Sequence, residues 1–322
     1  MKKTTKIGII GAGHVGSHVA SSLMTQGLCD EIVLLDTDEG KARRHADDIA
    51  DSVAYMPLPA KIYAGGYEAL ADADIVVLSA CSTIFEQDRL LELDATVKVI
   101  AEIAPQLTAS GFSGIVVSIS NPCDVIAQYF ARITGLNVVG TGTALDSARL
   151  CRRLAAMLGV SPHSVCAYEL GEHGDSEVAV WSSANISGAD LDDFCLAAGI
   201  DDPESMLASL AREVTHAAYD IIERKGATCY GIAMAVRRIA EAIIRDEHAV
   251  LPVSTLARGA YGIEGVCLGL PAVVGRSGVS QVLDLPLSRD ETERLLASAH
   301  KLKNPHGGMN KAAERKALRP CL

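Results

Sequence analysis

The segment Gly11-Ala12-Gly13-His14-Val15-Gly16 lies between a short apolar run, residues 6–10, and a stretch with helically spaced apolar residues, 14–27. The pattern G-x-G-x-x-G is weak alone, but between a strand and a helix it is typical of a dinucleotide-binding turn. The first glycine permits the tight turn, the second lets the backbone approach a pyrophosphate, and the third allows close helix–sheet packing. The helix N-terminus then favours phosphate binding. Our candidate cofactor-binding residues here are Gly11, Gly13, Val15 and Gly16.

A carboxylate after the next expected strand indicates which dinucleotide binds. Asp36 follows residues 31–35 and lies twenty residues past Gly16. A carboxylate at this place can accept both ribose hydroxyls and would repel the additional phosphate of NADP, so we predict NAD. The alternative is that Asp36 caps the helix expected to begin near residue 38. Lys41 is a further cofactor-binding candidate, and with Arg43 and Arg44 nearby it leaves NADP open.

Apolar strands alternate with helices through the first part of the chain. We expect further strands at residues 60–64, 73–79, 114–118 and 137–141, and helices at residues 39–53 and 90–110. Continuously apolar strands separated by helices indicate a parallel sheet covered on both faces. The rhythm changes near Thr143. We therefore predict an α/β protein, with a Rossmann-type doubly wound NAD-binding domain over residues 1–142 and a second, α+β substrate domain over residues 143–322, whose tail 304–322 is frayed.

The composition excludes several classes of protein. The 322 residues have room for about two domains, and a hydrophobic fraction of 49% supplies a core for each. The net charge of −11 makes nucleic acid and anionic membrane surfaces poor partners. Nine cysteines without a C-x-x-C pair predict reduced thiols in a cytoplasmic protein, with no metal site.

The chemistry is concentrated in two later segments. In Leu170-Gly171-Glu172-His173-Gly174-Asp175 a histidine stands between glycines after an apolar strand, which predicts an exposed turn position. Upstream, Asp146 and Arg149 are one helical turn apart and so share a face. An acid that orients a histidine, beside an arginine that can bind a carboxylate, suits redox chemistry on a hydroxy acid.

These segments together resemble the lactate/malate dehydrogenase family, and the resemblance covers nearly the whole chain. The matching segments occur in order: Gly11 to Gly16, Asp36, Ser120-Asn121-Pro122, Leu145-Asp146-Ser147-Ala148-Arg149, Gly171-Glu172-His173-Gly174-Asp175 and Lys225-Gly226-Ala227-Thr228. Several matches in order are far more specific than any one of them.

The resemblance implies a role for each matched residue. His173 is then the proton donor and acceptor, Asp146 fixes its tautomer, and Arg149 binds the substrate carboxylate. Asn121 contacts cofactor and substrate, although an ordinary Asn-Pro turn explains it nearly as well. Thr228 belongs to the substrate pocket, with a helix N-cap as the alternative.

The family's lid loop corresponds to residues 80–89. Arg89 aligns with the arginine that polarises the substrate carbonyl, and Ile84 aligns with the position that selects the substrate. Malate dehydrogenases have arginine at that position, and an isoleucine would leave a second carboxylate unpaired at a cost of several kcal/mol. The loop is one residue shorter than in lactate dehydrogenases, but the neighbours of Ile84 are not cationic either.

The resemblance therefore predicts an NAD-dependent dehydrogenase for an L-2-hydroxy acid with an apolar side chain, of the lactate or 2-hydroxyisocaproate type. Thr228-Cys229-Tyr230-Gly231 resembles the latter, and Gly231 could widen the pocket. Malate dehydrogenase and a non-catalytic NAD-binding sensor are the alternatives. Cys151 and Cys166 stand where some relatives bind fructose 1,6-bisphosphate with cationic residues, so we expect no such activation. The family analogy predicts a homotetramer.

Overall fold

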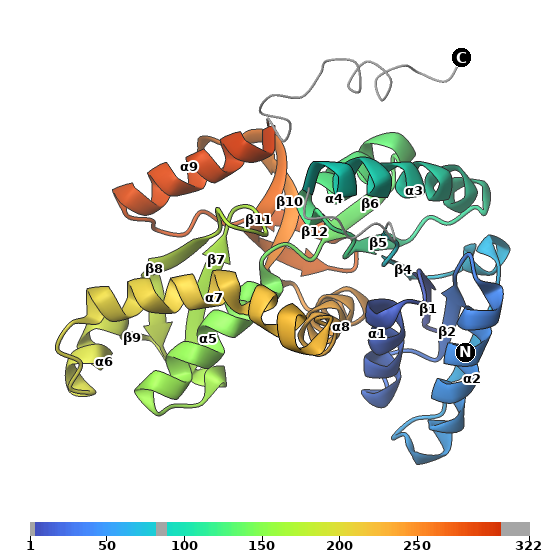
Figure 1. The fold of residues 1–322 in the computed structure, drawn as a ribbon, viewed down its shortest axis with the longest axis horizontal. Coiled ribbons are helices and arrows are strands. Elements are labelled where there is room, and N and C mark those ends of the chain that lie inside the picture. The colour runs from blue at the N-terminus through green and yellow to red at the C-terminus, as the bar shows by residue number, and fades with distance from the viewer. Residues whose placement is uncertain (1–3, 82–88, 304–322) are drawn as a thin grey trace.

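The computed structural model describes residues 4–81 and 89–303, and from 89 to 92 it describes only the course of a helix (Figure 1). Six parallel strands form its central sheet, in the order β3-β2-β1-β4-β5-β6. Their bounds are β1 (Lys6–Ile10), β2 (Glu31–Leu35), β3 (Lys61–Ala64), β4 (Ile75–Leu78), β5 (Ile115–Ser118) and β6 (Asn137–Gly140). This is the doubly wound order in which ligands bind outside the carboxyl ends of the strands, where the strand order reverses.

Helices cover both faces of this sheet, as the continuously apolar strands predict. On one face lie α1 (His14–Thr25), α2 (Glu39–Asp51) and α8 (Tyr230–Arg245), and on the other α3 (Arg89–Ala109) and α4 (Cys123–Thr134). Alternate residues of β4 serve the two faces, since Ile75 and Val77 pack toward α1 while Val76 and Leu78 pack toward α3 and α4. All four are fully buried, which explains why polar residues do not interrupt the strand.

Three strands from the later part of the chain continue this sheet. Strands β10 (Ala249–Arg258), β11 (Glu264–Gly275) and β12 (Gly278–Val282) extend it beyond β6, with Ser254 paired antiparallel to Gly140. The approach is close, because a Cβ on Gly140 would lie 2.7 Å from the Cβ of Ser254. The sheet therefore crosses the domain boundary that the sequence predicts at residue 142.

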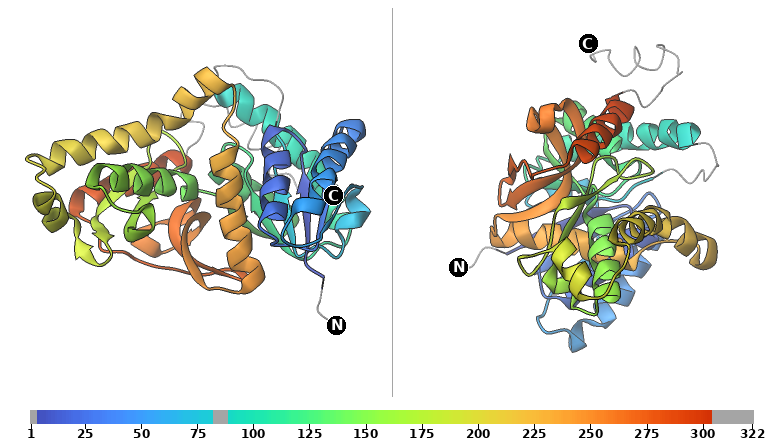
Figure 2. Two further views of the ribbon diagram at one scale, coloured as in Figure 1. Left: turned by 90° about the horizontal axis from the view of Figure 1, so that it is seen from below. Right: turned by 90° about the vertical axis from the view of Figure 1, so that its left-hand side faces the viewer.

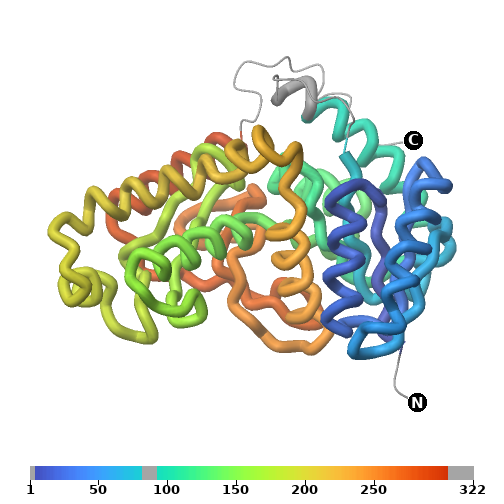
Figure 3. The backbone as a smooth tube through the Cα atoms, turned by 60° about the horizontal axis from the view of Figure 1, so that its bottom comes forward, coloured from blue at the N-terminus to red at the C-terminus, as the bar shows by residue number. Residues whose placement is uncertain are grey.

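A second sheet is antiparallel and three-stranded, and His173 lies between two of its strands. It comprises β7 (Val165–Leu170), β8 (Val178–Ile186) and β9 (Ala189–Asp190). Around it pack α5 (Ala144–Leu158), α6 (Leu191–Ala197), α7 (Pro203–Lys225) and α9 (Arg289–Lys303). Figures 2 and 3 show α8 between the two halves of the molecule, and it packs against α1 on one side and α5 on the other.

Four of these elements were not expected from the sequence, namely α4, β8, β9 and α6. The Asn-Pro pair before α4 is a turn signal, and α6 has only seven residues. In β8 the buried and exposed positions do not alternate regularly, because different neighbours cover its two ends. Among the described helices, none is long and apolar enough to cross a membrane.

Candidate active site

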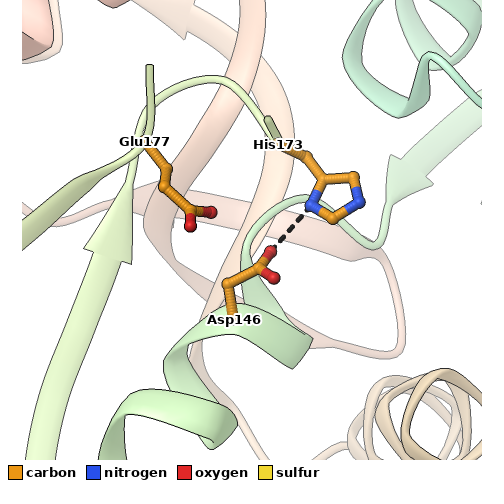
Figure 4. Close-up of side chains that lie close together, drawn as sticks. All are labelled: Asp146, His173 and Glu177. Atoms are coloured by element: carbon orange, nitrogen blue, oxygen red, sulfur yellow. Dashed lines mark hydrogen bonds and ion pairs between the residues drawn. The ribbon is translucent and has the colours of Figure 1, made fainter. Parts of the chain in front are cut away.

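The centre of the candidate site is a hydrogen bond between His173 and Asp146. His173 lies on the turn from β7 to β8, and its Nδ1 is 2.7 Å from Oδ2 of Asp146, in the first turn of α5 (Figure 4). The turn needs glycine at residue 171, whose φ is +96° and where a Cβ would lie 2.7 Å from Oγ of Ser298. The sequence therefore predicted correctly that His173 occupies a turn, and that Asp146 lies near it.

Arg149 is bound to the same carboxylate. One of its guanidinium nitrogens donates to Oδ1 of Asp146 at 2.8 Å, so the two residues share a helix face as their spacing predicts. Asp146 is 2% exposed, and its two oxygens are taken up by a histidine and an arginine. Arg149 therefore also balances the charge of the buried acid.

This arrangement shifts the pKa of both partners of the hydrogen bond. Burial disfavours the charged form of His173, but the carboxylate of Asp146 outweighs it and raises the pKa of His173 to about 9. Burial likewise tends to raise the pKa of Asp146, whereas His173 and then Arg149 bring it below its ordinary value. The pair is thus an imidazolium and a carboxylate at neutral pH.

The backbone of the histidine turn is held by groups that the sequence analysis missed. The N–H of His173 donates to Oδ2 of Asp124 at 2.9 Å, and the N–H of Glu172 donates to Oγ of Ser298 at 2.8 Å. Lys301 binds the side chain of Glu172 at 2.6 Å. An acid in the first turn of a helix, such as Asp124 in α4, is ordinarily explained by the helix dipole, so its buried role gave no separate signal.

The glycine turn between β1 and α1 is built as its sequence predicts. Gly11 has φ +101°, and a Cβ there would lie 2.5 Å from the carbonyl oxygen of Ser79. A Cβ on Gly16 would lie only 2.0 Å from the carbonyl oxygen of Gly11, so Gly16 makes room for the turn itself. Gly13 is the N-cap of α1 without a side-chain cap, and a Cβ there would meet no other atom within 4 Å. Gly13 thus leaves the helix N-terminus open to a phosphate-bearing ligand.

Asp36 stands at the carboxyl end of β2, beside the glycine turn. Its Oδ2 accepts from the N–H of Ala12 at 2.8 Å, and Lys41 Nζ is 3.6 Å from the same oxygen. The N-cap of α2 is Asp38, whose side chain accepts from the N–H of Lys41. Asp36 is therefore not the helix cap that the alternative interpretation required, and its carboxylate fits a ribose-binding position.

The other candidate residues lie in separate segments of the chain. Asn121 follows β5, and Thr228 precedes α8, whose N-cap position belongs to Cys229. A Cβ on Gly231 would lie 2.8 Å from Cδ1 of Leu145, so this glycine makes room for α5 and not for a ligand. Arg89 is the first residue of α3, and Ile84 lies outside the described residues.

Glu177 adds a third ionisable group to the centre. One ligand-type atom each from Asp146, His173 and Glu177 lies within 4.8 Å of the others (Figure 4). Figure 4 shows Glu177 on the side of Asp146 away from the His173 ring. The guanidinium of Arg149 already supplies a positive charge to Asp146, so we assign this group to acid–base chemistry.

Comparison with known proteins places this site in a family. The model for the lactate/malate dehydrogenase NAD-binding domain matches residues 5–139, and that for the lactate/malate dehydrogenase alpha/beta C-terminal domain matches residues 143–312. An L-lactate dehydrogenase of Clostridium perfringens is 40% identical over 306 residues, covering 94% of this chain and 96% of its own. One from Streptococcus pyogenes is 42% identical over 307 residues, covering 94% and 93%.

A solved structure is similar throughout. The minor L-lactate dehydrogenase of Enterococcus mundtii, in its ligands-bound form, has a TM-score of 0.89 and 38% sequence identity, over 93% of this chain and 96% of that one. The glycine turn, the Asp146–His173 pair and both family models thus agree, and the chain belongs to the lactate/malate dehydrogenase family.

Proposed function

We propose that this protein is an NAD-dependent dehydrogenase that interconverts an L-2-hydroxy acid and its 2-oxo acid. The observation that carries the proposal is the bond from His173 Nδ1 to Asp146, with Arg149 on the other carboxylate oxygen. An acid–base histidine and a carboxylate-binding arginine are the two groups that reduction of a 2-oxo acid requires from the protein.

The residues at the edge of the sheet fit the dinucleotide. The open N-terminus of α1 at Gly13 would receive the pyrophosphate, and the Asp36 carboxylate would accept the ribose hydroxyls. Val15, Lys41 and Asn121 are the further proposed contacts. The bound cofactor supplies the hydride that adds to the keto carbon. Proton transfer and binding of the substrate carboxylate are carried out by side chains of the protein.

The protein moves the proton and holds the acid. His173 donates the proton from Nε2 to the keto oxygen as the hydroxyl forms, and in the reverse direction it takes that proton back. Asp146 keeps the other ring nitrogen protonated and stabilises the imidazolium. Arg149 holds the substrate carboxylate while remaining close to Asp146. By family resemblance, Arg89 polarises the keto oxygen, and Asn121 and Thr228 complete the pocket.

The substrate is proposed to have an apolar side chain, as in lactate or 2-hydroxyisocaproate. The sequence at Ile84 supports this choice, because a dicarboxylate would find no cation there. Rates of NADH oxidation should be compared for pyruvate, 2-oxobutyrate, 4-methyl-2-oxopentanoate, phenylpyruvate and oxaloacetate. The highest kcat/KM on pyruvate indicates a lactate dehydrogenase, and on the branched acid a hydroxyisocaproate-type enzyme. A preference for oxaloacetate would contradict the proposal, and no reaction with any acid would favour a sensor module.

We also propose that the enzyme is a cytoplasmic homotetramer without fructose 1,6-bisphosphate activation. Tyr230 and Met234 on α8 are 66% and 46% exposed, which supports burial against another subunit. Cys151 and Cys166 carry no positive charge for a bisphosphate. Light scattering on the purified protein measures the assembly. A sigmoidal rate curve that fructose 1,6-bisphosphate makes hyperbolic would contradict the second expectation.

A further inference from the structure

A cavity of about 830 Å³ lies between α7, β8 and the first turns of α9, and Glu177 is part of its lining. Its lining includes Glu169 of β7, which pairs with Ala179 of β8, and Glu177, which directly precedes β8. Its walls include Trp181 and the apolar residues Ala179, Leu207 and Ala211. The cavity shares Glu177 with the candidate active site, but Asp146, His173 and Arg149 do not line it.

The two carboxyl groups in this lining are buried and incompletely bonded. Glu169 is 1% exposed and Glu177 is 7% exposed, and among the described residues Oε1 of each has no hydrogen-bond partner. A buried polar atom without a partner costs about 1–3 kcal/mol, so buried polar groups are nearly always paired. Two such oxygens lining one cavity can each accept a hydrogen bond from a donor that enters it.

The surroundings of these carboxyls favour a positively charged donor. Burial and then the carboxylate of Asp146 raise the pKa of Glu177 to about 8, although Thr215, His173 and Arg149 act in the opposite direction. Burial, followed by the carboxylates of Glu177 and Asp146, raises the pKa of Glu169 well above its ordinary range. Arg294 opposes this for Glu169, but its side chain is 50% exposed and pairs with Asp290. A cation between the two carboxyls would stabilise the ionised form of a carboxyl and donate hydrogen bonds to both oxygens.

We propose that this cavity binds a small organic ammonium compound, with the charged nitrogen between Glu169 and Glu177 and the carbon chain along Ala179, Leu207 and Trp181. An ammonium group has three N–H donors for the carboxyl oxygens. The apolar walls and the volume suit an organic group rather than a bare metal ion. The indole of Trp181 offers a face for cation–π contact, and the rim is exposed at Glu204 and Arg212.

Binding should release a proton. At pH 7 a buried carboxyl with a pKa of about 8 holds its proton, and the ammonium ion would replace this proton as the partner of the carboxylate. The proton goes to the buffer, and the nitrogen keeps all of its own protons. The affinity should therefore rise by about tenfold or more between pH 6.5 and 8.5, where the carboxyl becomes ionised.

The test uses n-butylammonium as the probe and n-butanol as its uncharged match, with calorimetry and thermal unfolding of the full chain. We expect butylammonium to bind, to raise Tm and to release a proton at pH 7, whereas butanol does none of these. Glu169→Gln keeps the size of the side chain and should weaken binding at least tenfold. Glu204→Gln makes the same change at the exposed rim and should alter affinity less than about twofold. NADH fluorescence checks that both variants are folded.

Several outcomes would overturn the proposal. Equal binding to Glu169→Gln and to the unmodified protein would show that the buried carboxyl is not the partner. Equal binding of butanol would show that the cavity binds ligands through its apolar lining and not through a charge on the ligand. Manganese binding that depends on Glu169, without binding of butylammonium, would make it a metal site. Each result is independent of whether the protein oxidises NADH with a 2-oxo acid.

Discussion

The glycine turn and the histidine turn both follow a buried strand, yet they are held in different ways. The glycine turn is held mainly by backbone, because the carbonyl groups of Ser79 and Gly11 leave no room for a Cβ on Gly11 and Gly16. The Asp36 carboxylate accepts from the N–H of Ala12 in the same turn. The histidine turn is held from a distance, by Asp124 of α4, Asp146 of α5 and Ser298 of α9. Cofactor binding should thus depend on space at a few neighbouring residues, and proton transfer on charges brought together by the whole fold.

Replacement of the histidine should give the largest difference between the two turns, because it affects proton transfer and leaves cofactor binding unchanged. His173→Gln removes the proton donor, and we expect kcat for 2-oxo acid reduction to fall about 10²–10⁴-fold. NADH affinity, measured by fluorescence titration, should change less than about twofold, because the glycine turn does not contact His173. A comparable loss of NADH affinity would mean that the regions are not independent.

The charge on Asp146 should set the pH range of the reaction. Reduction needs the imidazolium, so its rate should fall as the pH rises through about 9, whereas oxidation of the hydroxy acid should rise over the same range. In Asp146→Asn the pKa of His173 should move toward the ordinary 6.5, lowering the protonated fraction at pH 8 about 30-fold. Profiles of kcat/KM against pH for both directions check this. An unchanged profile in the variant would remove Asp146 from its assigned role.

Arg149→Lys tests the substrate side of the same centre. A lysine retains the charge but loses the planar pair of donors, so KM for the 2-oxo acid should rise about 10–100-fold. The kcat value should fall less, because His173 and Asp146 remain paired. NADH affinity serves as the control. A variant with unchanged KM would show that Arg149 only balances the charge of Asp146.

Two alanine substitutions test where the glycine turn has space for a Cβ. In Gly16→Ala the new Cβ would lie 2.0 Å from the carbonyl oxygen of Gly11, and we expect the turn to distort. The free energy of unfolding should fall by about 1–3 kcal/mol. Gly13→Ala is the matched change at an open position, with φ −78°, and should alter stability by less than about 1 kcal/mol.

Gly13→Ala also separates the effect on NADH affinity from the effect on stability. Gly13→Ala should keep the stability of the protein and still weaken NADH binding, because its Cβ would occupy the space open to the pyrophosphate. Denaturant unfolding and NADH titration on the same samples measure both quantities. Full NADH affinity in Gly13→Ala would show that the dinucleotide does not approach the turn at this residue.

Much of the fold followed from local patterns in the sequence. The apolar runs at β1, β2, β4 and β5 predicted a parallel sheet because every position in such strands is buried or nearly so. The glycine spacing predicted the turn, and the Asp146–Arg149 spacing predicted a shared helix face. These are short-range consequences of strand and helix geometry, and they need no knowledge of distant residues.

The sequence by itself thus determined the doubly wound sheet, the glycine turn, the cofactor class and the proximity of Asp146 to Arg149, but it gave no sign of Glu177 at the chemical centre. The tertiary structure alone decided that β10 to β12 extend the first sheet, that Asp124 and Ser298 hold the histidine turn, and that Glu169 and Glu177 line one cavity. The reason is physical. Steric limits act between neighbours in the chain, whereas burial, charge pairing and the pKa of a histidine depend on groups that only folding brings into contact.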